Sequence, residues 1–302
     1  MKLKYDPVAY VRSNGQAYHK VVVLAKSNSF SNLTHAVREL ISLQNVDGGW
    51  PFKWQKQMPS SIPFSAKALD ALIRAKANGE AEFFQRATTF LLKHQNLDGG
   101  WAENYALQKH MPKTVEVLPG KPKEPYWSTT SQSVTWITGI VLPALMDSKF
   151  QNRQVIDKAV SFLVKNQLKN GGWIPYKGYT FRADISSTGT AVKALLKAGL
   201  TRDSLIFRRA RECIVKEVRE LEYWKEPIQA VAALEAFLML GDSVKSKYCK
   251  LLIKTLINQQ RSDGGWNPVS SKHPSEINVT TAILEVFMEY IPHLVEAYLP
   301  HA

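Results

Sequence analysis

Three acidic residues stand where apolar helices are predicted to begin. Asp184 precedes the run Ile-Ser-Ser-Thr, and Glu226 and Glu276 occupy comparable positions before two further apolar runs. A carboxylate at a helix start can accept hydrogen bonds from free backbone amides, which is ordinary N-capping. A carboxyl group that is held protonated can instead act as a general acid. From the sequence alone, both interpretations remain open for each of the three residues.

Aromatic residues on or near the same apolar runs suggest a second kind of chemistry. Ring faces attract cations, so an aromatic-lined cavity can stabilise a positively charged intermediate. Aromatic residues at helical spacing also form ordinary core, and the spacing alone does not separate the two roles. The candidate binding residues are Trp127, Trp136, Phe181, Phe237, Phe287 and Tyr290.

The composition excludes several classes of protein. Of the 302 residues, 45% are hydrophobic and 22% are charged, which fits a globular chain and excludes a mostly disordered one. The net charge of +13 would suit an anionic partner, but no basic cluster mixed with aromatic residues indicates nucleic-acid binding. Two cysteines cannot form a disulfide framework, and no Cys or His spacing suggests a zinc site.

The first residues, Met-Lys-Leu-Lys-Tyr-Asp-Pro, lack the apolar stretch of a signal peptide. No window approaches the roughly 18 consecutive apolar residues of a membrane span. We therefore expect a cytoplasmic protein, either soluble or attached peripherally to an anionic membrane surface.

A heptapeptide that ends in Gly-Gly-Trp recurs along the chain. Its four clear copies read QNVDGGW, QNLDGGW, QLKNGGW and QRSDGGW. A fifth, worn copy, VRELEYW, keeps only its tryptophan, Trp224. The glutamine and tryptophan positions that recur in the four clear copies are Gln44, Trp50, Gln95, Trp101, Gln167, Trp173, Gln260 and Trp266.

Each heptapeptide separates two predicted helices. An amphipathic helix precedes it, with apolar residues at positions such as Ala87, Phe90 and Leu91. The Gly-Gly pair ends that helix, because glycine adopts the left-handed conformation of a C-cap at low cost. A loop and a helix rich in small and apolar residues follow, as expected of a buried helix. The tryptophan needs a partner for its indole N–H, and the glutamine can supply one or bind freed backbone groups.

This repeating unit predicts an all-α protein with one domain spanning residues 1–302. Outer amphipathic helices alternate with inner buried helices, so the units form an α/α toroid. The clear repeats cover about residues 31–290. A sixth unit could be assembled from the terminal stretches Gln16–Ala25 and Pro292–Leu299.

The heptapeptides resemble the QW motifs of squalene–hopene and oxidosqualene cyclases, within the prenyltransferase/squalene oxidase repeat group. The resemblance covers nearly the whole chain, but full triterpene cyclases carry two such domains and this chain has length for one. It implies that the motif residues brace the helices and perform no chemistry.

The class II terpene cyclases of this group protonate an alkene or epoxide with a DxDD motif at the start of an inner helix. The matching stretch here begins at Asp184. Ser186 and Ser187 stand where the middle and last aspartates of the motif would be. Because the middle aspartate is the usual proton donor, the motif is degenerate. The resemblance implies that Asp184 is the acid or holds a water with the two serines, with Glu226 and Glu276 as secondary acids.

The resemblance thus predicts a terpenoid-cyclase-like protein that acts on an isoprenoid, a prenyl diphosphate or polyprene, by protonation-initiated cyclisation. It implies no cofactor, and Mg²⁺ only if the substrate is a diphosphate. A second hypothesis is a non-catalytic toroid that binds an isoprenoid, another lipid or a partner protein. A third is a carbohydrate-active toroid, with Asp184 paired with one of the two glutamates.

Overall fold

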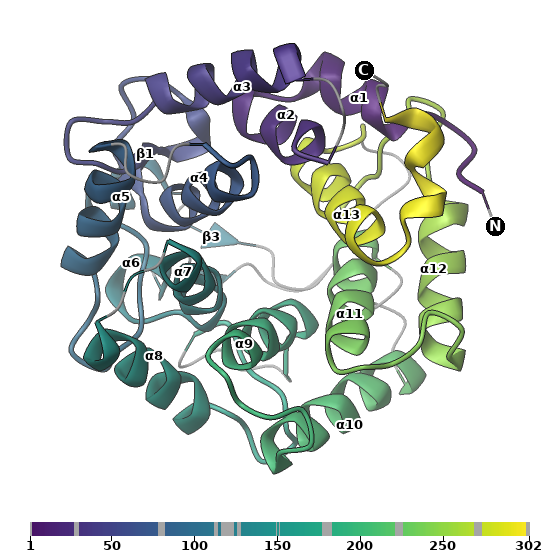
Figure 1. Cartoon of the computed structure of the whole chain (residues 1–302). Helices are drawn as coiled ribbons and strands as arrows, with labels where there is room; N and C mark the ends of the chain where they lie inside the picture. The colour runs from purple at the N-terminus through teal and green to yellow at the C-terminus, as the bar shows by residue number, and fades with distance from the viewer. Residues whose placement is uncertain are drawn as a thin grey trace.

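The computed structural model describes residues 2–26, 30–77, 82–111, 114–115, 124–125, 128–148, 150, 152–176, 183–220, 226–268 and 274–299. Its helices form two concentric rings, seen down the ring axis in Figure 1. The outer ring comprises α1 (Pro7–Asn14), α3 (Phe30–Ser42), α5 (Glu82–Lys93), α8 (Arg153–Lys165), α10 (Leu205–Glu220) and α12 (Lys247–Gln259). The inner ring comprises α2 (Ala17–Leu24), α4 (Ile62–Arg74), α7 (Thr135–Asp147), α9 (Ile185–Lys197), α11 (Pro227–Met239) and α13 (Ile277–Tyr290). The predicted α/α toroid is confirmed.

Short elements occupy the connections between the rings. Strands β1 (Trp50–Pro51) and β2 (Ser60–Ser61) pair antiparallel, as do β3 (Thr114–Val115) and β4 (Glu124–Pro125). The 3-10 helices are η1 (Phe52–Trp54), η2 (Tyr105–His110), η4 (Pro292–Leu294) and η5 (Glu296–Tyr298), and one further short helix is α6 (Ser128–Ser131).

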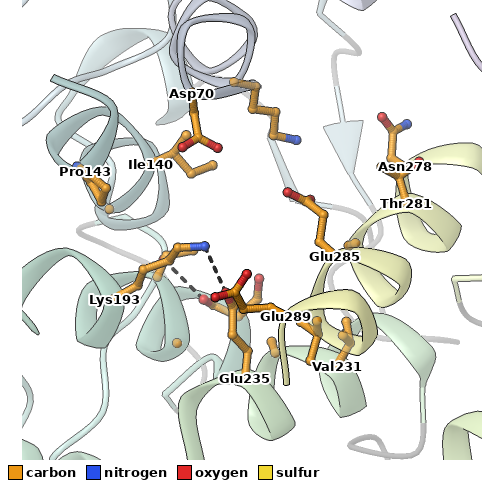
Figure 2. A pocket seen from close by; sticks show the side chains of 18 of the residues that line it. Asp70, Ile140, Pro143, Lys193, Val231, Glu235, Asn278, Thr281, Glu285 and Glu289 are labelled. Atoms are coloured by element: carbon orange, nitrogen blue, oxygen red, sulfur yellow. Dashed lines mark hydrogen bonds and ion pairs between the residues drawn. The ribbon is translucent and has the colours of Figure 1, made fainter. Parts of the chain in front are cut away.

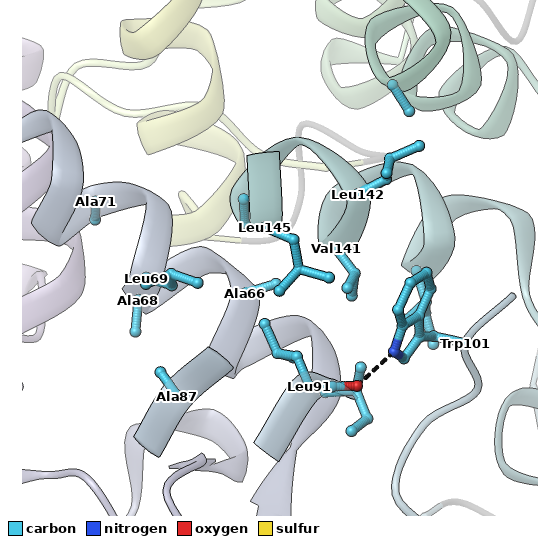
Figure 3. Close-up of a cluster of buried hydrophobic side chains, with 14 of the residues drawn as sticks. Ala66, Ala68, Leu69, Ala71, Ala87, Leu91, Trp101, Val141, Leu142 and Leu145 are labelled. Atoms are coloured by element: carbon cyan, nitrogen blue, oxygen red, sulfur yellow. Dashed lines mark hydrogen bonds between the residues drawn. The ribbon is translucent and has the colours of Figure 1, made fainter. Parts of the chain in front are cut away.

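The four tryptophans of the clear motifs occupy equivalent buried positions between the two rings. Each is 0% exposed, and each indole N–H donates to a leucine carbonyl ten residues earlier at 2.7 Å. Figure 3 shows this bond for Trp101 and Leu91. Each tryptophan backbone amide donates to a Ser or Thr hydroxyl on the following inner helix. The tryptophan therefore joins its own outer helix to its inner helix.

The glutamine of each motif joins one unit to the next. The Gln44 side-chain amide donates to its own turn at Gly48 O and to Phe83 O, at the start of the next outer helix, both at 2.9 Å. Gln95, Gln167 and Gln260 make the equivalent pairs of bonds. The expectation that glutamine binds freed backbone groups describes these bonds, whereas the tryptophan N–H finds a backbone carbonyl instead.

Gln260 closes the ring onto the N-terminal segment. Its amide donates to Tyr5 O at 2.9 Å, and its carbonyl oxygen accepts from the backbone amides of Lys4 and Tyr5 at 2.9 and 3.2 Å. Helix α1 takes the outer position of the sixth unit (Figure 1). The helix begins here because Asp6 caps its start and Pro7 stands in its first turn. Two stretches were expected to make up the sixth unit. Gln16–Ala25 supplies its inner helix α2, whereas Pro292–Leu299 forms η4 and η5 beside α13 and α1.

This closure can be tested with Gln260→Leu, and Gln44→Leu is the matched control. Both changes remove the two donated bonds, but only Gln260 holds a segment more than 250 residues away in the chain. We expect Gln260→Leu to speed amide hydrogen exchange across residues 4–14 at least tenfold, since each lost bond contributes about 1 kcal/mol. Equal protection of this segment in both variants would contradict the assigned role of Gln260.

Candidate ligand cavity

A cavity of about 530 Å³ lies at the centre of the inner ring. All of the inner helices described above contribute to its lining, and Figure 2 shows it from close by. The volume falls within the roughly 300–1,000 Å³ typical of small-molecule sites. A ligand of that size is therefore accommodated between the inner helices.

One side of the cavity is apolar. Helix α7 contributes Ile140 and Pro143, and α11 contributes Ile228 and Val231. The cavity also reaches Gly139, where an added Cβ would lie 2.8 Å from Thr190 on the neighbouring inner helix. Gly139 therefore allows α7 and α9 to approach each other closely beside the cavity.

The other sides carry a belt of charged side chains. We call this set the charge belt: Lys26, Asp70, Arg74, Lys193, Glu235, Glu285 and Glu289. Ion pairs connect neighbouring helices within it: Arg74 contacts Glu285 at 3.0 Å, and Lys193 contacts Glu235 at 2.9 Å. The belt is therefore a set of paired charges that links the inner helices across the cavity.

Exposure increases along the belt towards the C-terminal ends of the inner helices. The Glu285 side chain is 25% exposed. Glu289, one helical turn further along α13, is 53% exposed, and its partner Lys26 is 45% exposed. The cavity thus reaches solvent at this end.

Two cations of the charge belt stay charged because of their acidic neighbours. Burial lowers the pKa of Arg74, but Asp70 and Glu285 beside it raise this pKa more strongly. The neighbouring Glu235 likewise raises the pKa of Lys193, so both cations stay charged.

Asp184 is the N-cap of α9. Its carboxylate accepts a hydrogen bond from the Ser187 backbone amide at 2.6 Å. Burial raises the pKa of Asp184, and hydrogen bonds from Ser187 and Gln229 oppose the shift. Among the three residues at this helix start, Ser186 lines the cavity, while Asp184 and Ser187 lie outside its lining. The capping role anticipated from the sequence is present.

The two glutamates expected as secondary acids also stand at helix starts. Glu276 caps α13 and accepts from the Val279 amide at 2.9 Å. Glu226 precedes α11 without a side-chain capping bond, and burial raises its pKa. Neither residue lines the cavity, so the structure does not bring them together with Asp184 around one ligand position.

The candidate aromatic residues separate into three groups. Tyr290 lines the cavity. Phe237 and Phe287 are 0% exposed and belong to the core, where Phe287 packs edge-on against Trp266. Trp136 is half-buried and packs against the core. Core packing was the alternative interpretation of these side chains. Trp127, Phe181 and the worn-motif Trp224 lie outside the described residues.

The charge belt was missed in the sequence, although a signal was present. Asp70, Lys193, Glu235 and Glu285 each stand eight residues after the first residue of their inner helix, within an otherwise apolar run. A helix buried on several faces has no solvent-exposed side for such a charge. The repeated offset places all four side chains at one level of the toroid, facing its centre (Figure 2).

Two further searches cover only the described part of the chain. There, no helix combines the length and hydropathy needed to cross a bilayer. The same residues include no group of three or more His, Cys, Asp or Glu side chains placed to hold a metal ion.

Residues 15–181 match the model of the squalene–hopene cyclase C-terminal domain, over more than half of the chain. The chain belongs to this family. Among relatives of this cyclase family, squalene–hopene cyclase of Zymomonas mobilis is 31% identical over 141 residues, covering 46% of this chain. Lanosterol synthase of Aspergillus fumigatus is 28% identical over 144 residues, again covering 46%. The chain spans 18% and 16% of these two proteins, less than a quarter of their length.

Solved structures extend the similarity of this cyclase-family chain to nearly its whole length. The type II terpene cyclase MstE from Scytonema, in complex with geranylgeranyl dihydroxybenzoate, superposes with a TM-score of 0.64 at 15% identity. The match covers 92% of this chain and 87% of that one. An α-amylase from Clostridium perfringens has a TM-score of 0.62 at 11% identity, with 91% and 86% covered. These likenesses show the fold.

Proposed function

We propose that this cyclase-family toroid binds an isoprenoid in its central cavity. The observation that carries the proposal is the apolar wall formed by α7 and α11 inside a cavity of about 530 Å³. A flexible hydrocarbon chain gains free energy when such a wall removes it from water. The family relationship supports an isoprenoid over other apolar ligands, because a relative of this fold holds a geranylgeranyl compound.

We further propose that binding is not followed by protonation of the isoprenoid. In the described lining the carboxylates are Asp70, Glu235, Glu285 and Glu289, all members of the charge belt. Each lies beside a lysine or arginine within 3.0 Å. Pairing with a cation favours the ionised form of a carboxyl group, which has no proton to give to an alkene. Burial opposes this effect at Glu285, where it raises the pKa, while Arg74 and Lys193 lower it.

A second candidate function, protonation-initiated cyclisation with Asp184 as the acid, is favoured by one observation. Burial raises the pKa of Asp184, and its near neighbour Ser186 lines the cavity. A raised pKa keeps the proton on the carboxyl group to higher pH, but it also makes the acid weaker. Asp184 is in addition occupied in capping α9.

One experiment separates the two functions. The purified protein and Asp184→Asn are incubated with geranyl, farnesyl and geranylgeranyl diphosphate and with squalene, with and without Mg²⁺. Asparagine is as good an N-cap as aspartate, so the variant removes the acid and keeps the helix start. We expect at least one isoprenoid to bind by calorimetry and to be recovered unchanged by mass spectrometry. A cyclised product that disappears in Asp184→Asn would establish the second function instead.

A further inference from the structure

A group of aromatic rings packs beside the cavity where α2 and α4 begin. Tyr18, which lines the cavity, stacks on Trp54 with ring centroids 4.6 Å apart. Phe64 packs edge-on against Trp54 at 4.8 Å. The rings come from α2, η1 and α4, and of the three only Tyr18 lines the cavity, with Trp54 and Phe64 packed behind it.

The turn that presents Trp54 has an unusual backbone. Lys53 and Trp54 have φ angles of +54° and +58°, in the left-handed region that bulky side chains rarely adopt. Strained backbone of this kind persists where the surrounding structure requires it, and it occurs often at binding sites. Here it holds a tryptophan against Tyr18, with only 5% of the residue exposed.

The indole N–H of Trp54 has no hydrogen-bond acceptor among the described residues, although it is buried. The tryptophans of the repeated motif differ in this respect, because each of them donates to a leucine carbonyl. A buried donor without an acceptor destabilises the protein. Because Trp54 does not line the cavity, this donor belongs to the packing behind Tyr18 and is not offered to a ligand.

Lys67 is a second donor without a strong acceptor at the same end. Its side chain lines the cavity, and its Nζ atom lies 6.0 Å from the centre of the Phe64 ring. Within the described part of the chain, no carboxylate lies within 4 Å of Lys67, whereas the cations of the charge belt are all paired. Burial lowers the pKa of Lys67, and the more distant Glu285 and Glu276 oppose the shift.

His19, on the neighbouring turn of α2, does not compete with Lys67 as a cation. Its Nδ1 atom accepts from the Gln16 amide at 3.2 Å, so the ring proton sits on Nε2 and faces Asn278 Oδ1 at 3.1 Å. Burial lowers the pKa of His19, which favours the neutral ring. Lys67 is therefore the charge that this end of the cavity offers to a ligand.

We propose that this end of the cavity is a subsite for an oxyanion, the phosphate or carboxylate head of the bound isoprenoid. Lys67, which lines the cavity together with Tyr18, would pair with the anion. The hydrocarbon chain would then extend along the apolar wall of α7 and α11. This inference rests on the proposed function and specifies the head group of its ligand.

The test compares ligands that share one chain and differ in their heads. Farnesyl diphosphate, farnesoic acid and farnesol are titrated calorimetrically into wild type, Lys67→Met, Trp54→Phe and Lys26→Met. We expect wild type to bind the diphosphate about tenfold to a hundredfold more tightly than the alcohol, as charge-assisted hydrogen bonds allow. Lys67→Met should lose this preference, whereas Trp54→Phe, which removes a donor outside the cavity lining, should keep it. Lys26→Met, at the open end, should keep it.

A second readout guards against misfolding. Because Lys67 is a poorly paired cation in the free protein, Lys67→Met should melt at or above the wild-type temperature without ligand. Equal affinity of wild type for diphosphate, acid and alcohol, or a preference that survives in Lys67→Met, would overturn the oxyanion subsite and leave isoprenoid binding intact. Failure of all three compounds to bind would overturn the proposed function and the subsite with it.

Discussion

Gly171→Ala is expected to lower the free energy of unfolding by about 3 kcal/mol or more. An added Cβ at Gly171 would lie 2.1 Å from the carbonyl oxygen of Arg209, in the backbone of the next outer helix. The φ angle of +92° adds strain for any L side chain. Relieving the overlap moves α10 away from the motif turn, which would break the bond from the Gln167 side chain to Ile206 O.

Gly199→Ala is the matched control for this prediction. Gly199 has nearly the same φ angle, +94°, but a Cβ there would meet nothing within 4 Å. The Gly199→Ala variant should therefore lose only the free energy that the left-handed conformation costs an alanine, about 1–2 kcal/mol. Chemical denaturation of the wild type and both variants measures how much free energy of unfolding each variant loses. If the two losses are equal, the motif glycine matters only for its conformation and the contact with the next helix is unimportant.

Glu103→Gln is expected to change how stability depends on pH. Glu103 is 5% exposed, and its carboxylate accepts from the Ser61 hydroxyl at 2.7 Å and from the amides of Ile62 and Asn104 at 2.8 Å. Burial raises its pKa to about 7 from an ordinary value of 4.5, and these hydrogen bonds oppose the shift. A glutamine can accept from the same two backbone amides through its carbonyl oxygen and can donate to the Ser61 hydroxyl through its NH₂ group, without titrating.

The direction in which stability changes with pH follows from the number of protons bound by the folded and the unfolded protein. Between the two pKa values the folded protein holds a proton on Glu103 that the unfolded chain has released, so stability falls as the pH rises. The wild type should lose about 2–3 kcal/mol more than Glu103→Gln between pH 5 and pH 8. Denaturation curves at several pH values measure the difference, in which other titrating groups such as Asp184 cancel. Parallel pH profiles would show that Glu103 is ionised throughout.

The architecture was predictable because the recurring motif is determined locally. Gly48 and its counterparts require left-handed backbone, and Trp50 requires a buried position with a bond for its N–H. Those demands repeat at each copy, so the alternation of outer and inner helices follows from the spacing. The sixth outer helix was not predicted because α1 carries no motif of its own, although Asp6 and Pro7 are a standard helix start.

The cavity was less predictable, for a different physical reason. A helix buried on all sides has one face towards the ring axis and others towards its neighbours, and its hydrophobic pattern does not distinguish them. Phe237 and Phe287 were therefore expected in a cavity but pack in the core. Lys67 and Trp54 depend on contacts between α2, η1 and α4, which no local pattern specifies.

The bonds of Gln260 make the joint between the last and first units equivalent to the joints inside the chain. The Tyr298 hydroxyl also lies 3.2 Å from the Leu3 carbonyl oxygen, so the two ends of the described chain meet at this joint (Figure 1). The ring is therefore closed by the same kind of glutamine bond that joins the motif-bearing units inside the chain. Circular permutants that join residue 299 to residue 2 through a short linker, and begin at Leu200 beyond the unobstructed Gly199, should fold to the same ring. If they do, the order of the units around the ring does not depend on where the chain begins.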